Sequence, residues 1–195
     1  MVDEKKGLYI AEPGMAVSSF IEKLNKLSYK NFPVDEVLNL LRKEALSFEF
    51  LEPYVFFSDA RYTRNVIHKS PEFEVLVMCW KPGQKSTIRE HKNNQSLLQV
   101  ALGNLQISYY QEDPTPGAKI VKKINAVDLK QGSIEGASGV YQVENVFGTD
   151  AVSLHVFIPP LSDTDIYDIE TNTKRAMSFG YHSIHGKLVG PEDKR

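Results

Sequence analysis

Arg89 and His91 stand two residues apart in the segment PGQKSTIREHKNNQSLL, which runs from residue 82 to residue 98. If this segment is a strand, side chains two residues apart point to the same face, so we expect both to enter one interior. Two histidines at this spacing would offer a metal ion two imidazole ligands. Here one of them is an arginine, whose guanidinium stays charged and has no lone pair to donate. The segment therefore predicts a polar interior site to which this strand supplies one imidazole.

The elements that must position these residues change character near Leu51. Between Met15 and Leu51 apolar residues recur at helical spacing, which predicts two amphipathic helices. From residue 52 to residue 185 short runs rich in Val, Ile, Phe and Tyr are broken by Gly, Pro and Asn, for example FEVLVMCW, SLLQVALG and AVSLHVFIPP. Closely spaced strands without helical crossovers predict an antiparallel barrel or sandwich. Residues 186–195 are expected to form a polar tail, and the whole chain one domain.

Composition narrows the classes of protein to consider. The chain has 195 residues, 42% hydrophobic and 25% charged, which is typical of a globular domain that needs no disulfide. Its 23 basic and 25 acidic residues nearly balance, so no global field would attract nucleic acid. We expect no membrane partner, because no run approaches about 18 apolar residues, and we expect a cytoplasmic monomer. The single cysteine, Cys79, excludes an internal disulfide and a multi-cysteine metal site.

Several motifs resemble those of a known family. Gly83, Arg89, His91, Ser96 and Gly103 are spaced as in the first signature of cupin barrels. The segments YTRN, MCW, ALGNL, GVYQVEN, AVSLHVFIPP and YHS, in this order, resemble the cysteine dioxygenase family over nearly the whole chain. The resemblance implies a mainly β cupin fold, that is, a double-stranded β-helix or jelly-roll barrel. The two predicted helices would pack against its outer side.

The same resemblance implies a site. Known members of the family are non-haem iron(II) enzymes that oxidise cysteine to cysteine sulfinate, with the iron held by three histidines. The matching positions in this chain are Arg89, His91 and Tyr141, so His91 is the one imidazole left at those positions. The family's substrate-carboxylate arginine matches Arg64, with Tyr62 beside it.

A supporting Ser-x-His-x-Tyr network of the family falls on Ser153, His155 and Phe157, so the tyrosine hydroxyl is lost. The cysteine that some animal members cross-link to that tyrosine matches Ser96. His155 and Tyr141 are expected to be catalytic only if iron is bound through a substitute set of ligands.

Three function classes follow. The leading hypothesis is a protein without a working iron site and without a cofactor, which binds a small anionic or amino-acid-like molecule through Arg64, Tyr62, Arg89, His91, Ser153 and His155. The second is an active thiol dioxygenase with iron(II) in a non-standard site that includes His91. The third is a structural or partner-binding relic, in which Arg89 pairs with a carboxylate such as Glu144 and fills the former metal position.

Overall fold

The structure, a computed structural model, describes residues 13–44, 46–115, 120–161 and 163–190, except for the side chains of residues 13 and 91–94. The helices are α1 (Pro13–Ser28), α2 (Val34–Glu44), α3 (Phe48–Leu51) and the 3-10 turn η1 (Glu52–Tyr54). The strands are β1 (Thr63–Lys69), β2 (Glu74–Trp80), β3 (Ile88–Leu102), β4 (Asn104–Glu112), β5 (Val121–Lys130), β6 (Ile134–Glu144), β7 (Ala151–Ile158), β8 (Thr164–Asp168), β9 (Thr173–Met177), β10 (Ser183–Ile184) and β11 (Lys187–Leu188).

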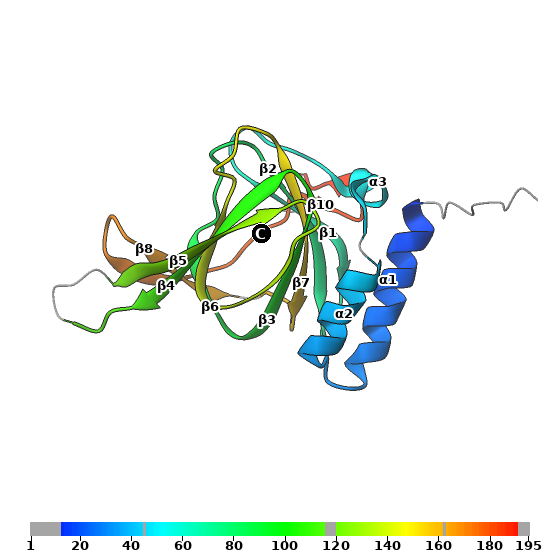
Figure 1. The fold of residues 1–195 in the computed structure, drawn as a ribbon, viewed down its shortest axis with the longest axis horizontal. Helices are drawn as coiled ribbons and strands as arrows, with labels where there is room; N and C mark the ends of the chain where they lie inside the picture. The colour runs from blue at the N-terminus through cyan, green and yellow to red at the C-terminus, as the bar shows by residue number, and fades with distance from the viewer. Residues whose placement is uncertain (1–12, 45, 116–119, 162, 191–195) are drawn as a thin grey trace, which may run out of the picture.

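The two expected helices are present, followed by a short third one. The second helix, α2, carries acidic residues in its first turn and basic residues in its last, which complement the helix dipole. Val37 and Leu41, one turn apart, are buried and give the helix its apolar face. The four-residue helix α3 was not predicted, because FEFL is too short to show helical periodicity. Figure 1 shows α1 and α2 side by side against one flank of the barrel.

The described strands join in one sheet that curls into a barrel. Their order is β11-β10-β1-β2-β7-β3-β6-β4-β5, and β8 pairs with both β3 and β9. The long strand β3 is central, because its first part pairs with β6 and β8 and its second part with β6 and β7. The β4–β5 hairpin extends away from the helices (Figure 1). The mainly antiparallel β-barrel with N-terminal helices on one flank is thus confirmed. The segment EDPTPGAK, with two prolines and a glycine, also predicts a hairpin loop, but its residues 116–119 lie outside the described part.

Strand alternation divides the apolar residues into two layers. Along β7, Val152, Leu154 and Val156 pack toward the helices, whereas Ser153 and His155 belong to the barrel interior. The helix-facing layer includes residues of α1, α2, β2, β3 and β7. The interior is lined by a second apolar cluster drawn from β1, β2, β3, β4, β6 and β7. Polar side chains on the interior face are therefore surrounded by apolar ones.

The C-terminal segment differs from the expected loose tail. Strand β10 pairs in parallel with β1, and β11 pairs with β10, so Lys187 and Leu188 belong to the sheet rather than to a tail that begins at residue 186. The backbone amide of His185 also donates to the carbonyl of Val66 at 2.8 Å. Two-residue strands have no readable alternation, which is why the sequence did not indicate them.

Two sequence expectations concern Cys79 and membranes. Cys79 is buried in the helix-facing layer, and burial raises the pKa of its thiol to about 11. The thiol therefore stays protonated at neutral pH and points away from the barrel interior. Among the helices of the described residues, none is long and apolar enough to cross a bilayer.

Gly103→Ala is expected to lower the free energy of unfolding by about 2 kcal/mol or more. Gly103 links β3 to β4 with a φ of +69°, and an added Cβ would lie 2.4 Å from the backbone carbonyl oxygen of Asp150. Gly132→Ala is the control, because Gly132 also has a positive φ (+86°) but nothing within 4 Å of an added Cβ. Urea unfolding should show the larger loss at Gly103, and equal losses would mean that the steric contact is relieved by a shift of the backbone.

His68 is expected to make the fold sensitive to mild acid. Its ring stacks on Phe73 at 4.8 Å between ring centroids, and burial, followed by the neighbouring His185, lowers its pKa. Below about pH 6.5 the His68 side chain takes up a proton in the unfolded chain but stays neutral in the folded chain. The contribution of His68 to stability is therefore fully present above that pH and is lost as the pH falls. The urea midpoint should fall further between about pH 7.5 and about pH 5.5 in the wild type than in His68→Gln. An equal fall in both proteins would contradict this role of His68.

Candidate functional site

Five of the expected site residues come together on the interior face of the barrel. Arg64 lies on β1, Arg89 on β3, Tyr141 on β6, and Ser153 and His155 on β7. All five side chains are at most 4% exposed. The register brings them close, because Arg89 lies directly opposite Tyr141, while Arg64 and Ser153 both lie opposite Met78 from the two sides of β2. The interior is therefore a polar site inside an apolar shell.

Arg64 has a single ionic neighbour among the described residues. Its Nη2 atom lies 3.6 Å from Oε2 of Glu74, which is completely buried at the start of β2. The guanidinium also lies over the rings of Phe179 and Tyr181, at 5.2 Å and 5.4 Å from their centroids. Burial lowers the pKa of Arg64, the charge of Glu74 opposes this change, and the charge of Arg89 adds to it. Glu74 is thus the counter-ion of this arginine.

Arg89 is completely buried and has no such neighbour. By geometry none of its three guanidinium nitrogens donates a hydrogen bond to a described residue, although the guanidinium lies close enough to the Tyr141 hydroxyl to lower the pKa of that phenol. Its guanidinium lies over aromatic rings instead, 5.4 Å from the centroid of Phe179 and 5.9 Å from that of Tyr141. A buried, unpaired cation is costly, so Arg89 is the most unusual group of the site.

Arg89 does not pair with Glu144, the carboxylate that the relic hypothesis offered as an example. Glu144 and Tyr141 are three positions apart on β6, so they point to opposite faces of the sheet. Because Tyr141 faces the interior, Glu144 faces outward, where its charge acts on the outward-facing Tyr110. The carboxylate of Glu144 therefore cannot neutralise the interior.

Tyr141 is a neutral phenol in this setting. Its hydroxyl shares a hydrogen bond with Oγ of Ser96 at 2.6 Å, and both residues are buried. Burial raises the pKa of Tyr141, and the nearby positive charge of Arg89 lowers it to a smaller extent. A phenolate is therefore not favoured at neutral pH.

A chain of hydrogen bonds connects Trp80 to the β7 residues. The indole nitrogen of Trp80 donates to Oγ of Ser153 at 2.9 Å, and this oxygen lies 2.8 Å from Nε2 of His155. Tyr62 stacks on the indole of Trp80, with 4.6 Å between ring centroids and an angle of 11°. Tyr62 therefore contacts the site through Trp80, and His155 is held on the interior face by Ser153.

His91 is the one expected site residue whose side chain lies outside the described part of the chain. Its backbone is opposite Gly139 in the pairing of β3 and β6, two positions along from Arg89 and Tyr141. Ser96 lies opposite Phe157 in the pairing of β3 and β7, so the two positions that the family resemblance relates to a cross-link are neighbours.

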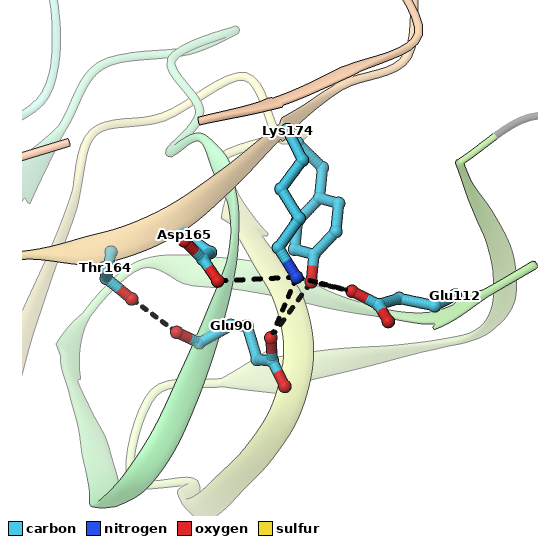
Figure 2. Close-up of polar contacts among 6 residues, drawn as sticks. Glu90, Glu112, Thr164, Asp165 and Lys174 are labelled. Atoms are coloured by element: carbon cyan, nitrogen blue, oxygen red, sulfur yellow. Dashed lines mark hydrogen bonds and ion pairs between the residues drawn. The ribbon is translucent and has the colours of Figure 1, made fainter. Parts of the chain in front are cut away.

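Glu90 lies outside the interior, on the opposite face of β3 from the arginine that precedes it. Figure 2 shows it in a surface cluster around Lys174, whose amine is 2.8 Å from Glu112, 3.3 Å from Asp165 and 3.6 Å from Glu90. The hydroxyl of Tyr167 also donates to Glu90 at 3.0 Å. Glu90 is thus engaged in holding β8 and β9 against β3 and β4, and it is not available to the interior.

Three residues of the site were not found by sequence reasoning. Glu74 could have been found, because it shares the alternation of FEVLVMCW with residues that face the interior. Phe179 and Tyr181 lie in the segment between β9 and β10, and together they form what we call the aromatic cover of the two arginines. The sequence gives no signal for the cover beyond two aromatic residues at a spacing of two.

The described residues do not fit an iron(II) ion at the position that the family resemblance implies. Arg89 adds a positive charge where a donor is required, and the Tyr141 phenol is protonated and bound to Ser96. Within the described ranges no group of three or more His, Cys, Asp or Glu side chains lies together in a way that could hold a metal ion. Repulsion between a guanidinium and a divalent cation at an effective dielectric constant of about 20 amounts to several kcal/mol.

The barrel, its flanking helices and the inward-facing polar residues define a cupin. The family model described as "Cysteine dioxygenase type I" matches residues 13–170. Human cysteine dioxygenase type 1 is 31% identical over 138 residues, which are 68% of each chain, and the zebrafish (Danio rerio) protein of the same name is 26% identical over 163 residues, 79% of each chain. A double-stranded β-helix protein from Klebsiella pneumoniae has a TM-score of 0.46 and 18% identity, covering 66% of this chain and 95% of its own. The chain belongs to the cysteine dioxygenase type I family, as its motifs predicted.

Proposed function

We propose that this cysteine-dioxygenase-like cupin binds a small anion, such as a carboxylate, between Arg64 and Arg89 and does not act as an iron dioxygenase. The observation behind the proposal is Arg89, which is completely buried while its three guanidinium nitrogens have no hydrogen-bond partner among the described residues. Five N–H donors in a planar fork are suited to carboxylate or other oxyanions. An anion between the two arginines would satisfy these donors and offset the buried charge.

The proposal gives each neighbouring residue a role. Arg64 and Arg89 supply charge and donors, and the Ser96 hydroxyl keeps the Tyr141 phenol in place beside Arg89. Ser153 and His155 supply further polar groups on the facing strand. The aromatic cover separates the arginines from water, which strengthens their attraction for an anion. None of these roles requires a metal ion or a redox step.

Two measurements on one sample test the proposal. Protein purified without chelators or a nickel column is analysed for metal by plasma mass spectrometry and for oxygen uptake with cysteine. Thermal unfolding of the same protein is then followed with and without acetate at constant ionic strength. We expect little iron, no uptake and a rise in unfolding temperature with acetate. Near-stoichiometric iron with oxygen uptake would instead support an active dioxygenase with another set of ligands. Little iron, no oxygen uptake and no rise in unfolding temperature with acetate would support the structural or partner-binding relic.

A further inference from the structure

Three Asp, Glu, Lys or Arg side chains are buried in the part of the chain that the structure describes. They are Arg64, Arg89 and Glu74, with 4%, 0% and 0% of their surface exposed. Glu74 is close to Arg64, at 3.6 Å, and its Oε2 atom also accepts a hydrogen bond from the backbone of Leu161 at 3.3 Å. A further carboxylate, that of the half-buried Glu135, accepts a hydrogen bond from the hydroxyl of Tyr109. Glu74 therefore offsets one of the two buried positive charges.

Both arginines belong to one electrostatic unit. Their guanidinium carbons lie 5.2 Å and 5.4 Å from the centroid of the same ring, that of Phe179, and the charge of Arg89 lowers the pKa of Arg64, so each arginine is affected by the other. Arg64 already has a counter-ion, whereas no described carboxylate pairs with the Arg89 guanidinium, which acts instead on the neutral hydroxyl of Tyr141. The unit thus has two positive charges and one negative charge, and its unpaired charge is on Arg89.

We infer that the pocket selects singly charged small anions over doubly charged ones, with Arg89 as the anchor. This inference rests on the proposed function and specifies its ligand class. The cost of removing an ion from water grows with the square of its charge, whereas its attraction to fixed charges grows linearly. The enclosed interior has one net positive charge, which a monoanion neutralises. A dianion would bring an uncompensated negative charge into the same low-dielectric space.

The walls of the pocket indicate the rest of the ligand. The aromatic cover and the ring of Tyr141 surround the guanidinium groups, so the part of the ligand away from its charge meets apolar surface. The complete burial of Arg89 restricts the ligand to a few heavy atoms unless the cover moves. The ligand class is therefore a small organic monoanion, such as a short monocarboxylate or a sulfonate of similar size.

Three probe anions separate charge from shape. Acetate is planar with one charge, methanesulfonate is tetrahedral with one charge, and sulfate is tetrahedral with two. Binding of each to the wild-type protein is measured by titration calorimetry at constant ionic strength. Acetate and methanesulfonate should both bind about tenfold or more tightly than sulfate. Equal or tighter binding of sulfate would overturn the inference and leave the proposed anion pocket intact, whereas no binding of any probe would overturn the proposed function as well.

Two variants place the effect at the named residues. Arg89→Met should abolish binding of all three probes, and Arg175→Met, at an exposed arginine on β9, should leave binding unchanged. Glu74→Gln raises the net charge of the unit by one, so sulfate should gain affinity relative to acetate. If Glu74→Gln does not fold, the anion comparison on the wild type decides alone. Retained monoanion binding in Arg89→Met, or an unchanged ratio in folded Glu74→Gln, would contradict the inference.

Discussion

Arg89→Met is expected to raise the free energy of unfolding by about 1–4 kcal/mol in a buffer free of carboxylate, sulfate and phosphate. Burying a guanidinium removes its hydration, and Arg89 recovers neither hydrogen bonds nor an ion pair from the described residues. Methionine has a similar length, no charge and a flexible apolar chain that suits the rings of Phe179 and Tyr141. The expected gain is unusual, because most substitutions of buried residues destabilise a protein.

The measurement is urea unfolding of the wild type and the variant, with and without acetate. Arg175→Met is the control for loss of an exposed charge and should change stability by about 0.5 kcal/mol or less. Acetate should stabilise the wild type and not the Arg89 variant, so that the difference between them narrows as acetate is added. A less stable Arg89→Met protein in anion-free buffer would show that the guanidinium has contacts that offset its burial, as in the structural relic.

The double substitution Arg89→His with Tyr141→His is expected to raise the iron content from little to about one ion per chain. The two positions lie directly opposite each other on β3 and β6, and both side chains face the interior. The change removes a positive charge and a protonated phenol and adds two neutral imidazoles in neighbouring positions. If these positions are the lost ligands, the two new imidazoles should suffice for iron(II) together with the donors already in the interior.

Metal content after incubation with iron(II) under anaerobic conditions, followed by gel filtration, measures the effect. Arg89→Gln with Tyr141→Phe is the matched control, because it removes the same charge and hydroxyl without adding a donor. Each single histidine variant should hold less iron than the pair. A folded double variant that still refuses iron would mean that the interior does not provide the ligand set that the family resemblance implies.

The fold could be predicted because its signals are local and repeated. Short runs rich in Val, Leu and Phe mark β2, β7 and the second part of β3, and helical spacing marks α1 and α2. The same alternation predicts that Arg89 faces the interior, where its side chain is completely buried. The short elements α3, β10 and β11 were missed because two to four residues cannot show a period.

The site was predicted less completely, for a physical reason. Its position follows from motifs within single strands, whereas its charge balance depends on contacts between distant segments. Glu74 lies near Arg64 because β1 and β2 pair, and Phe179 lies over Arg89 although the two are far apart in the sequence. Such contacts are set by how the chain returns to the barrel after β9. Alternation along β6 alone is enough to exclude Glu144 as a partner of Arg89, because Glu144 and Tyr141 lie three positions apart on that strand.

In the proposed anion pocket, the aromatic cover would separate how tightly an anion is held from how quickly it is exchanged. Affinity would depend on the arginines and Glu74, which are at most 4% exposed, and exchange would depend on Phe179 and Tyr181, whose rings lie against the guanidinium groups. Both residues lie between β9 and β10, outside the strands, where the amide of His182 donates to the carbonyl of Arg64 at 2.8 Å and Lys69 donates to the hydroxyl of Tyr181 at 2.7 Å. The fraction of protein with bound anion would then follow slow changes in anion concentration and average over rapid ones. Substitutions in the aromatic cover would change the rate of anion exchange without changing the affinity.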